Sequence, residues 1–137
     1  MGNVSFHFSY RVGIGDINYG GHVSNAAVLT IFQDARLAFL AALGPFSELE
    51  VGGCGLIMPE AHLYYRQEMF HGDMLRVGVR VAALKRSGFI LDYRIERTGE
   101  LTAEGNTLLV CFDYYKRKPC RIPPLFHTAL KSAADSG

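Results

Sequence analysis

The segment from residue 26 to residue 43 is the feature that most restricts the fold of this chain. It is almost entirely apolar, with Gln33, Asp34 and Arg36 grouped near its middle. Two ionisable side chains at mid-depth are costly in a bilayer, so we expect a helix buried inside a protein rather than a membrane span. Apolar residues cover most faces of this helix, and other elements must therefore wrap it.

Clear signals mark both ends of this helix. Ser24 is a favoured N-cap, and Gly44-Pro45 predicts the end because Gly accepts a left-handed cap and Pro cannot continue a helix. Directly ahead lies a turn-forming cluster, residues 16–25, which reads Asp-Ile-Asn-Tyr-Gly-Gly-His-Val-Ser-Asn. A helix N-terminus presents unpaired N–H groups and a partial positive charge. It therefore suits a site where negative charge develops on a carbonyl oxygen.

Alternation of apolar and polar residues predicts strands on both sides of the helix. Apolar residues at alternate positions from Val4 to Ile14 predict one strand with a single buried face. The glycine-rich residues 46–58 predict a connecting loop. Four more strands are expected, joined by short turns as an antiparallel meander, at residues 61–70, 74–85, 89–98 and 101–116. A short helix is expected at residues 125–133.

This order predicts an α+β fold in a single domain that spans residues 1–137. A twisted antiparallel five-stranded sheet would curl around one long central helix. The hydrophobic fraction of 49% and the charged fraction of 20% are typical of a globular chain. The edges of such a sheet stay exposed, and association of two copies edge to edge would cover them.

Charge and cysteine usage exclude several classes of function. The net charge of +1 gives no strong field for nucleic acid or for an anionic membrane. Cys54, Cys111 and Cys120 are odd in number and widely spaced, which favours free thiols over a zinc site or a disulfide framework. Residues 1–10 lack the apolar core of a signal peptide, so we expect a cytoplasmic location. No metal-ligand spacing relates the histidines outside the cluster, His7, His62, His71 and His127.

The cluster at residues 15–25 and the helix motif Phe-Gln-Asp-Ala-Arg-Leu-Ala-Phe-Leu at residues 32–40 resemble the hotdog-fold acyl-CoA thioesterases. The likeness is to the 4-hydroxybenzoyl-CoA thioesterase-like superfamily and covers residues 5–124. It implies hydrolysis of a thioester to a free acid and coenzyme A, without a metal or any cofactor beyond the coenzyme A of the substrate. It also implies a homodimer or homotetramer with acyl-CoA sites at the subunit interface. From the net charge, we expect no nucleic-acid or membrane partner.

Asn18 departs from the pattern of this superfamily, whose members often carry an Asp at this position as nucleophile or base. An amide can do neither, but it can hydrogen-bond a thioester carbonyl or orient a water. Two alternatives therefore stay open beside a thioesterase. One is a non-catalytic acyl- or acyl-CoA-binding protein on the same scaffold. The other is a hotdog dehydratase, although the differently spaced His and Asp motif of those enzymes is not found.

The candidate catalytic residues are Asp16, Asn18 and His22. Asp16 or His22 would activate water, or a carboxylate from the partner subunit would do so. The structural alternative for all three is turn chemistry that holds the loop. Asp34 is a further candidate base across the interface, and pairing with Arg36 or with a strand arginine is its favoured alternative.

The candidate substrate-binding residues fall into two groups. Small residues beside the helix start would let substrate approach the backbone, and N–H groups there would stabilise an oxyanion. This first group is Gly20, Gly21, Val23 and Asn25. The resemblance puts the second group near the phosphates of coenzyme A, although a solvated turn is its structural alternative. That group is Lys85, Arg86 and Ser87, with Lys116, Arg117 and Lys118 as a weaker phosphate candidate.

Overall fold

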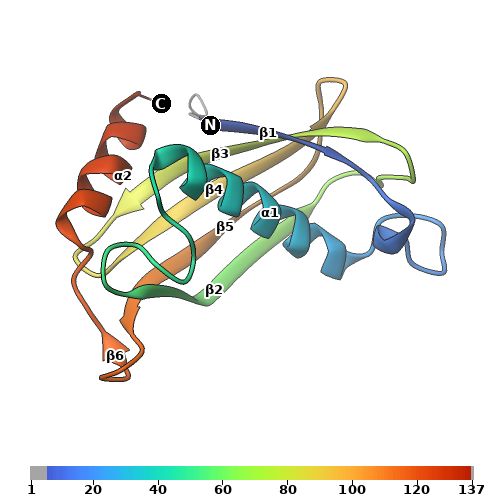
Figure 1. Ribbon diagram of the computed structural model, residues 1–137. Helices are drawn as coiled ribbons and strands as arrows, with labels where there is room; N and C mark the ends of the chain where they lie inside the picture. Colours follow the sequence, from blue (N-terminus) through green and yellow to red (C-terminus); the bar gives the residue numbers. More distant parts are fainter. Residues whose placement is uncertain (1–5, 137) are drawn as a thin grey trace.

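The computed structural model describes residues 6–136, which form one antiparallel sheet and two helices (Figure 1). In chain order the elements are β1 (Phe6–Arg11), the 3-10 turn η1 (Ile14–Asp16), α1 (Asn25–Leu43), β2 (Gly55–Tyr65), β3 (Met74–Leu84), β4 (Gly88–Arg97), β5 (Glu100–Asp113), β6 (Lys118–Pro119) and α2 (Pro124–Ser136). The strand order is β1-β3-β4-β5-β2, and the short β6 pairs with β5. The predicted combination of one long helix with five main antiparallel strands is confirmed. The expected meander of the last four strands is wrong for β2, which pairs with β5 rather than with β3.

Helix α1 packs along the inner face of the sheet, and both predicted ends are confirmed. The Ser24 side chain accepts a hydrogen bond from the Ala27 N–H, and Gly44 ends the helix with φ of 157°. The helix is long and apolar enough to cross a membrane, with a mean hydropathy of 1.6. The sheet covers one side of it, whereas Leu37 on the other side remains 40% exposed. This open side is free to meet another chain.

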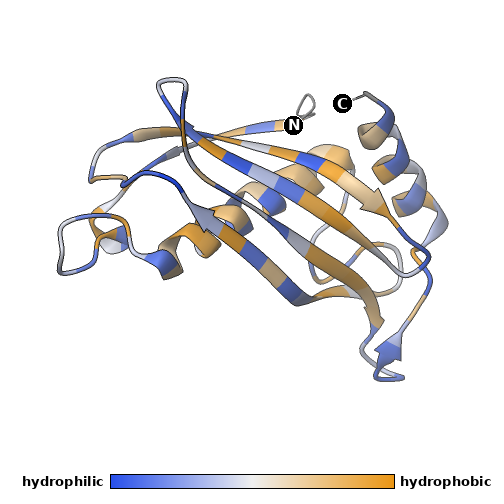
Figure 2. Ribbon diagram, turned by 180° about the vertical axis from the view of Figure 1, so that it is seen from behind, coloured by the Kyte–Doolittle hydropathy of each residue, from blue (hydrophilic) through white to orange (hydrophobic). Residues whose placement is uncertain are grey.

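Alternation within the strands separates a buried inner face from a polar outer face. On β4 the residues Phe89, Leu91, Tyr93 and Ile95 are all fully buried; Tyr93 stacks on Phe32 of α1, and Phe89 contacts Phe126 of α2. The residues between them point outward, where Asp92 pairs with Arg80 of β3 at 2.8 Å. Figure 2 shows this outer face, on which hydrophilic and hydrophobic positions alternate along the strands. The period of two in the sequence therefore predicts the faces of the sheet correctly.

A buried polar network joins α1 to the sheet. Arg36 is 3% exposed, and its guanidinium donates to the Tyr93 hydroxyl at 3.1 Å and to the Glu48 carboxylate at 3.1 Å. The Tyr93 hydroxyl also lies 2.7 Å from the Thr107 hydroxyl, and the Tyr93 ring stacks on Phe32 at 4.4 Å. Burial would lower the pKa of Arg36, but its contacts with Tyr93 and Glu48 raise it. These partners allow a charge to sit in an apolar helix.

The first predicted strand is too long at its C-terminal end. β1 ends at Arg11, and Ile14 begins η1 with 75% of its surface exposed, so its expected place on the buried face is wrong. The chain leaves the strand because Asp16 N–H donates to the Gly13 carbonyl, which closes a tight turn. Val4, the other end of the predicted strand, lies outside the described residues.

The predicted loop at residues 46–58 and the strand at residues 61–70 are both displaced, because β2 already begins at Gly55. A Cβ at Gly55 would lie 2.5 Å from the Tyr114 ring, so this glycine permits close packing within a strand rather than marking a loop. β2 ends at Tyr65, after which the N–H groups of Arg66 and Gln67 both donate to the Thr102 carbonyl. Residues 66–73 form the connector from β2 to β3.

The C-terminal segments agree with the expectation except at the end of β5. α2 extends the predicted short helix by a few residues, and its Phe126 and Leu130 are fully buried. β5 stops at Asp113, whose carboxylate accepts the N–H groups of Tyr115 and Lys116 and turns the chain. The predicted strand end at residue 116 is therefore wrong.

Candidate active site

The loop ahead of α1 is a compact hairpin held by its own backbone. Asn18 N–H donates to the His22 carbonyl at 3.0 Å, Gly21 N–H donates to the Asn18 carbonyl at 3.1 Å, and Ile17 bridges to Val23. The Asn18 side-chain oxygen accepts the Gly20 N–H at 2.8 Å. The turn chemistry considered for Asn18 is thus present, and it uses the oxygen of the amide while leaving the NH₂ group to donate elsewhere.

Gly20 brings two of the candidate catalytic side chains together. A Cβ at Gly20 would lie 3.2 Å from the Asn18 side-chain oxygen and 3.4 Å from His22 Nε2. Both polar groups therefore lie close to Gly20, and a larger residue at this position would displace them. His22 Nδ1 lies 3.4 Å from the Val23 carbonyl, an arrangement that leaves Nε2 as the ring atom facing Gly20.

Asp16 is tied to β1. One oxygen of its carboxylate accepts the Tyr10 hydroxyl at 2.8 Å and the Gly13 N–H at 2.9 Å, while its backbone carbonyl accepts the Ser24 N–H at 2.9 Å. Burial, followed by the hydrogen bond to Asp16, raises the pKa of Tyr10 to about 12. The bonds of Asp16 anchor the loop between β1 and the start of α1.

A cavity of about 260 Å³ opens beside the loop at the start of α1. Among the sequence candidates, His22, Val23 and Asn25 line it. Asp16, Asn18, Gly20 and Gly21 belong to the same hairpin but do not line it. The remaining walls, none of which is a candidate from the sequence, are Val28, Tyr65, Arg66, Gln67, Glu68 and Met69.

The cavity takes its second wall from the connector between β2 and β3. These strands are consecutive in sequence but separated by β4 and β5 in the sheet, so the connector must cross the end of the sheet beside α1. The Val23 N–H donates to the Met69 carbonyl at 2.8 Å, which fastens the connector to the hairpin. Only the strand order reveals this neighbourhood. The polar run at residues 66–68 is the one local signal, and nothing in the sequence says what it faces.

The backbone donors available to an oxyanion are fewer than the sequence suggests. The N–H groups of Val23 and Ser24 are already bonded to the carbonyls of Met69 and Asp16. The expected role of the Val23 N–H is therefore wrong. Asn25 and Ala26 are the first two residues of α1, where N–H groups have no partner within the helix. They are the donors that remain.

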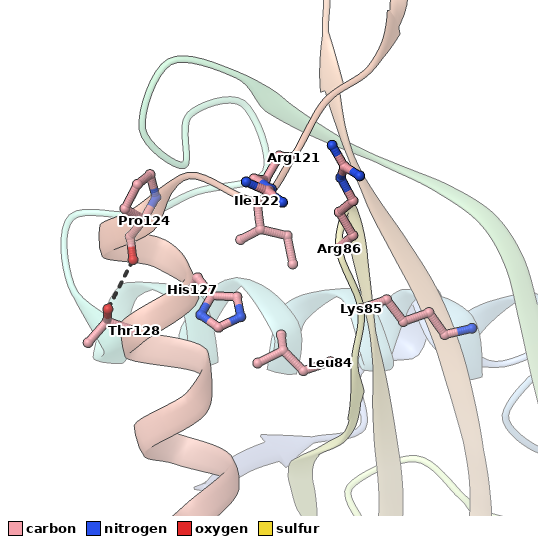
Figure 3. A pocket seen from close by; sticks show the side chains of 8 residues that line it. All are labelled: Leu84, Lys85, Arg86, Arg121, Ile122, Pro124, His127 and Thr128. Carbon is pink, nitrogen blue, oxygen red and sulfur yellow. Dashed lines mark hydrogen bonds between the residues drawn. The ribbon is translucent and has the colours of Figure 1, made fainter.

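The second group of candidates lies far from this cavity. Lys85 and Arg86 line a cleft of about 580 Å³ between the end of β3 and α2, together with Arg121 and His127 (Figure 3). Lys85 extends away from α2 in this view. Ser87 does not line the cleft, and its carbonyl accepts the Cys111 N–H at 2.8 Å. The cleft concentrates positive charge that would suit phosphate groups.

The length of β3 separates the cleft from the hairpin. Met74, at the start of β3, pairs with Arg11, and Asp73 accepts the Val12 N–H just ahead of η1. Leu84, at the other end of β3, lines the cleft. At the usual rise of a strand, the two ends lie about 30 Å apart. Within one chain, the hairpin and the basic cleft therefore do not form a single site.

The other candidates stay apart from both hollows. Asp34 is half-buried on the β1 side of α1, since its charge contributes to the raised pKa of Tyr10. Between residues 6 and 136 Asp34 joins no ion pair, so its expected pairing with an arginine is wrong. Arg36 pairs with Glu48 instead. The weaker phosphate candidates Lys116, Arg117 and Lys118 are exposed in the turn after β5 and in β6.

The three cysteines form a cluster of free thiols inside the fold. Cys54 contacts both Cys111 and Cys120, and burial is the main cause of the raised pKa of the Cys54 thiol. Burial likewise raises the pKa of Cys111 to about 11. Within residues 6–136, no group of three or more His, Cys, Asp and Glu side chains is arranged to hold a metal ion.

Comparison with known proteins assigns the chain to a family. A family model described as the thioesterase-like superfamily matches residues 12–130. The chain belongs to the thioesterase-like superfamily. A 1,4-dihydroxy-2-naphthoyl-CoA hydrolase of Synechococcus elongatus is 28% identical over 135 residues, which cover 95% of this chain and 98% of that protein.

Solved structures agree with this membership. A gentisyl-coenzyme A thioesterase superimposes with a TM-score of 0.83 at 25% identity, over 91% of this chain and 99% of the other. A 1,4-dihydroxy-2-naphthoyl-CoA thioesterase from Synechocystis superimposes with a TM-score of 0.84 at 24% identity, over 92% and 95% of the two chains. The hotdog fold expected from the sequence is thus confirmed for this thioesterase-like chain.

Proposed function

We propose that this protein hydrolyses acyl-CoA thioesters at the cavity beside the start of α1. The observation that carries the proposal is a cavity lined by His22 beside the free N–H groups of Asn25 and Ala26, with the Asn18 side chain near His22 on the other side of Gly20. This is the arrangement that a developing oxyanion requires. The relatives named as CoA thioester hydrolases support the same reaction.

In the proposed mechanism the thioester carbonyl points at the start of α1. The N–H groups of Asn25 and Ala26 donate to its oxygen, and the Asn18 NH₂ group reaches the same oxygen or the attacking water. His22 Nε2, beside Gly20, exchanges a proton near the sulfur. Water adds to the carbonyl carbon, the carbon–sulfur bond breaks, and the products are a carboxylic acid and coenzyme A. Gly20 and Gly21 have no side chains, so the backbone of the hairpin can approach the substrate closely.

The basic cleft supports a homo-oligomer in this proposal. Lys85, Arg86 and Arg121 would bind the phosphates of coenzyme A, but they lie at the opposite end of β3 from the cavity of their own chain. A second copy in antiparallel orientation would bring its cleft toward the first chain's cavity. Two further features favour such a pairing, the edge position of β2 and the open side of α1 with Leu37.

A hydroxylated aromatic acyl group is the substrate class proposed here. Two relatives are named for such substrates, 1,4-dihydroxy-2-naphthoyl-CoA and gentisyl-CoA. The cavity walls Val23, Val28 and Met69 are apolar, and the Tyr65 hydroxyl at the rim donates to the Asn25 carbonyl at 3.2 Å. The free thiols of the chain fit the cytoplasm, which is the location proposed for the enzyme.

The test is release of free coenzyme A from a panel of thioesters by the purified protein. We expect kcat/KM for 4-hydroxybenzoyl-CoA or 1,4-dihydroxy-2-naphthoyl-CoA to exceed that for hexanoyl-CoA and palmitoyl-CoA by at least about tenfold. Binding of these compounds without hydrolysis would favour the acyl-CoA-binding alternative. Hydration of an enoyl thioester without release of coenzyme A would favour a dehydratase.

A further inference from the structure

The proposed site needs a group that takes a proton from water, because His22, the titratable hairpin side chain that lines the cavity, has its proposed role at the sulfur. Asn18 is an amide and cannot act as a base. The Asp16 carboxylate is bonded through one oxygen to Tyr10 and Gly13, and Asp16 does not line the cavity. Asp34 lies on the β1 side of α1, more than two helical turns from Asn25.

One carboxylate does line the cavity, and it comes from the connector between β2 and β3. Glu68 and His22 both line this cavity. The residues that follow them, Met69 and Val23, are joined by a backbone hydrogen bond in which the Val23 N–H donates to the Met69 carbonyl at 2.8 Å. Met69 is 3% exposed, so its side chain anchors the connector in the core. On the other side Arg97 donates to the Glu68 carbonyl at 2.8 Å. The backbone of Glu68 is therefore held on both sides.

The side chain of Glu68 is not occupied by the basic residues around it. The Arg66 guanidinium donates to Glu104 at 3.0 Å, and the Arg97 guanidinium pairs with Asp73 at 2.9 Å. In the described part of the chain no hydrogen bond or ion pair is recorded for the Glu68 carboxylate. A fixed backbone with an uncommitted carboxylate at the mouth of a cavity is what a general base requires.

We infer that Glu68 is the general base of the reaction, an inference that rests on the proposed thioester hydrolysis. The Glu68 carboxylate takes a proton from water as the water oxygen bonds to the thioester carbonyl carbon. The resulting tetrahedral oxyanion is held by the N–H groups at the start of α1. Its collapse breaks the carbon–sulfur bond, and the proton on Glu68 passes by way of His22 to the departing coenzyme A thiolate. One water is consumed, and one acid and one thiol are formed.

The experiment compares Glu68→Gln with a matched control, Glu100→Gln. The first change removes the charge and keeps the shape of the side chain, and the second makes the same change at the exposed first residue of β5. Both variants are assayed with the panel thioester that the wild type hydrolyses best, in water and with hydroxylamine added. Hydroxylamine is nucleophilic without help from a base, so its acyl transfer reports the rest of the site.

We expect Glu68→Gln to lower kcat for hydrolysis by at least about 100-fold. Hydroxamate formation and the melting temperature stay close to those of the wild type, and Glu100→Gln keeps full activity. Hydrolysis by Glu68→Gln within about threefold of the wild type overturns the role of Glu68 alone. A wild type that hydrolyses no member of the panel overturns the proposed function, and the role of Glu68 with it.

Discussion

The Tyr10 hydroxyl donates a hydrogen bond to an Asp16 carboxylate oxygen at 2.8 Å. This bond links the end of β1 to the hairpin that carries Asn18 and His22, and the Gly13 N–H reaches the same oxygen at 2.9 Å. Asp16 in turn accepts the Ser24 N–H, so the N-cap of α1 is connected to β1 through a single residue. The position of the hairpin against α1 therefore depends on a tyrosine outside it.

Replacement of this tyrosine, Tyr10→Phe, is expected to destabilise the protein by about 1 kcal/mol at pH 8, because a partly exposed bond to a carboxylate is lost. Burial and the Asp16 bond raise the pKa of Tyr10 from 10.0 to about 12. Between these values the native state keeps a proton that the unfolded state releases, so wild-type stability falls as the pH rises through this window. Urea denaturation at several pH values from 8 to 12 measures the effect.

The control for this change is Tyr19→Phe, since Tyr19 is fully exposed on the same hairpin. The loss of stability between pH 10 and pH 12 should be smaller in Tyr10→Phe than in Tyr19→Phe. An equal loss of stability between pH 10 and pH 12 in the two variants would show that the Tyr10–Asp16 bond is not what raises the pKa of Tyr10.

Replacement of the amide at residue 18 tests what it contributes. In Asn18→Asp the carboxylate can still accept the Gly20 N–H, so the hairpin is kept. A carboxylate cannot donate to the thioester oxygen and repels the oxyanion, so we expect kcat to fall about tenfold or more. Steady-state kinetics with an aromatic acyl-CoA measure the change. A gain of activity would instead indicate that Asn18 marks a binding protein that has lost its catalytic carboxylate.

The buried Arg36 is expected to contribute strongly to stability. Arg36→Met leaves the Glu48 carboxylate without its charged partner and removes a bond from Tyr93, so we expect a loss of about 3 kcal/mol in the free energy of unfolding. The double variant Arg36→Met with Glu48→Gln should lose less than the two single variants together. Chemical denaturation of all four proteins gives the coupling, and additive losses would mean that the pair does not interact.

The role of the basic cleft is tested by comparing substrates with and without the nucleotide part of coenzyme A. Arg86→Ala is expected to raise KM for an acyl-CoA about tenfold, because a charge-assisted contact to phosphate is lost. The matching N-acetylcysteamine thioester has no nucleotide, so its kinetics should be unchanged. Lys131→Ala, on the exposed side of α2, is the control. Equal effects on both thioesters would remove the cleft from the binding site.

The sequence by itself determines the long helix, its caps and the inner faces of the strands. Ser24 and Gly44 act on their own turn of backbone, and alternating residues such as Leu91 and Tyr93 face the same way in any strand. The family is also readable from the hairpin before α1. These features are local, because capping, turn formation and side-chain period depend on residues close in the chain.

Only the tertiary structure decides which polar groups meet. Glu68 lines the same cavity as His22 because the sheet order separates β2 from β3 and sends their connector past the start of α1. Arg36 is buried because Tyr93 and Glu48, distant in sequence, converge on it. Lys85 and Arg86 lie a full strand length from the hairpin. Such neighbourhoods depend on pairings between distant segments, which no local period or turn signal encodes.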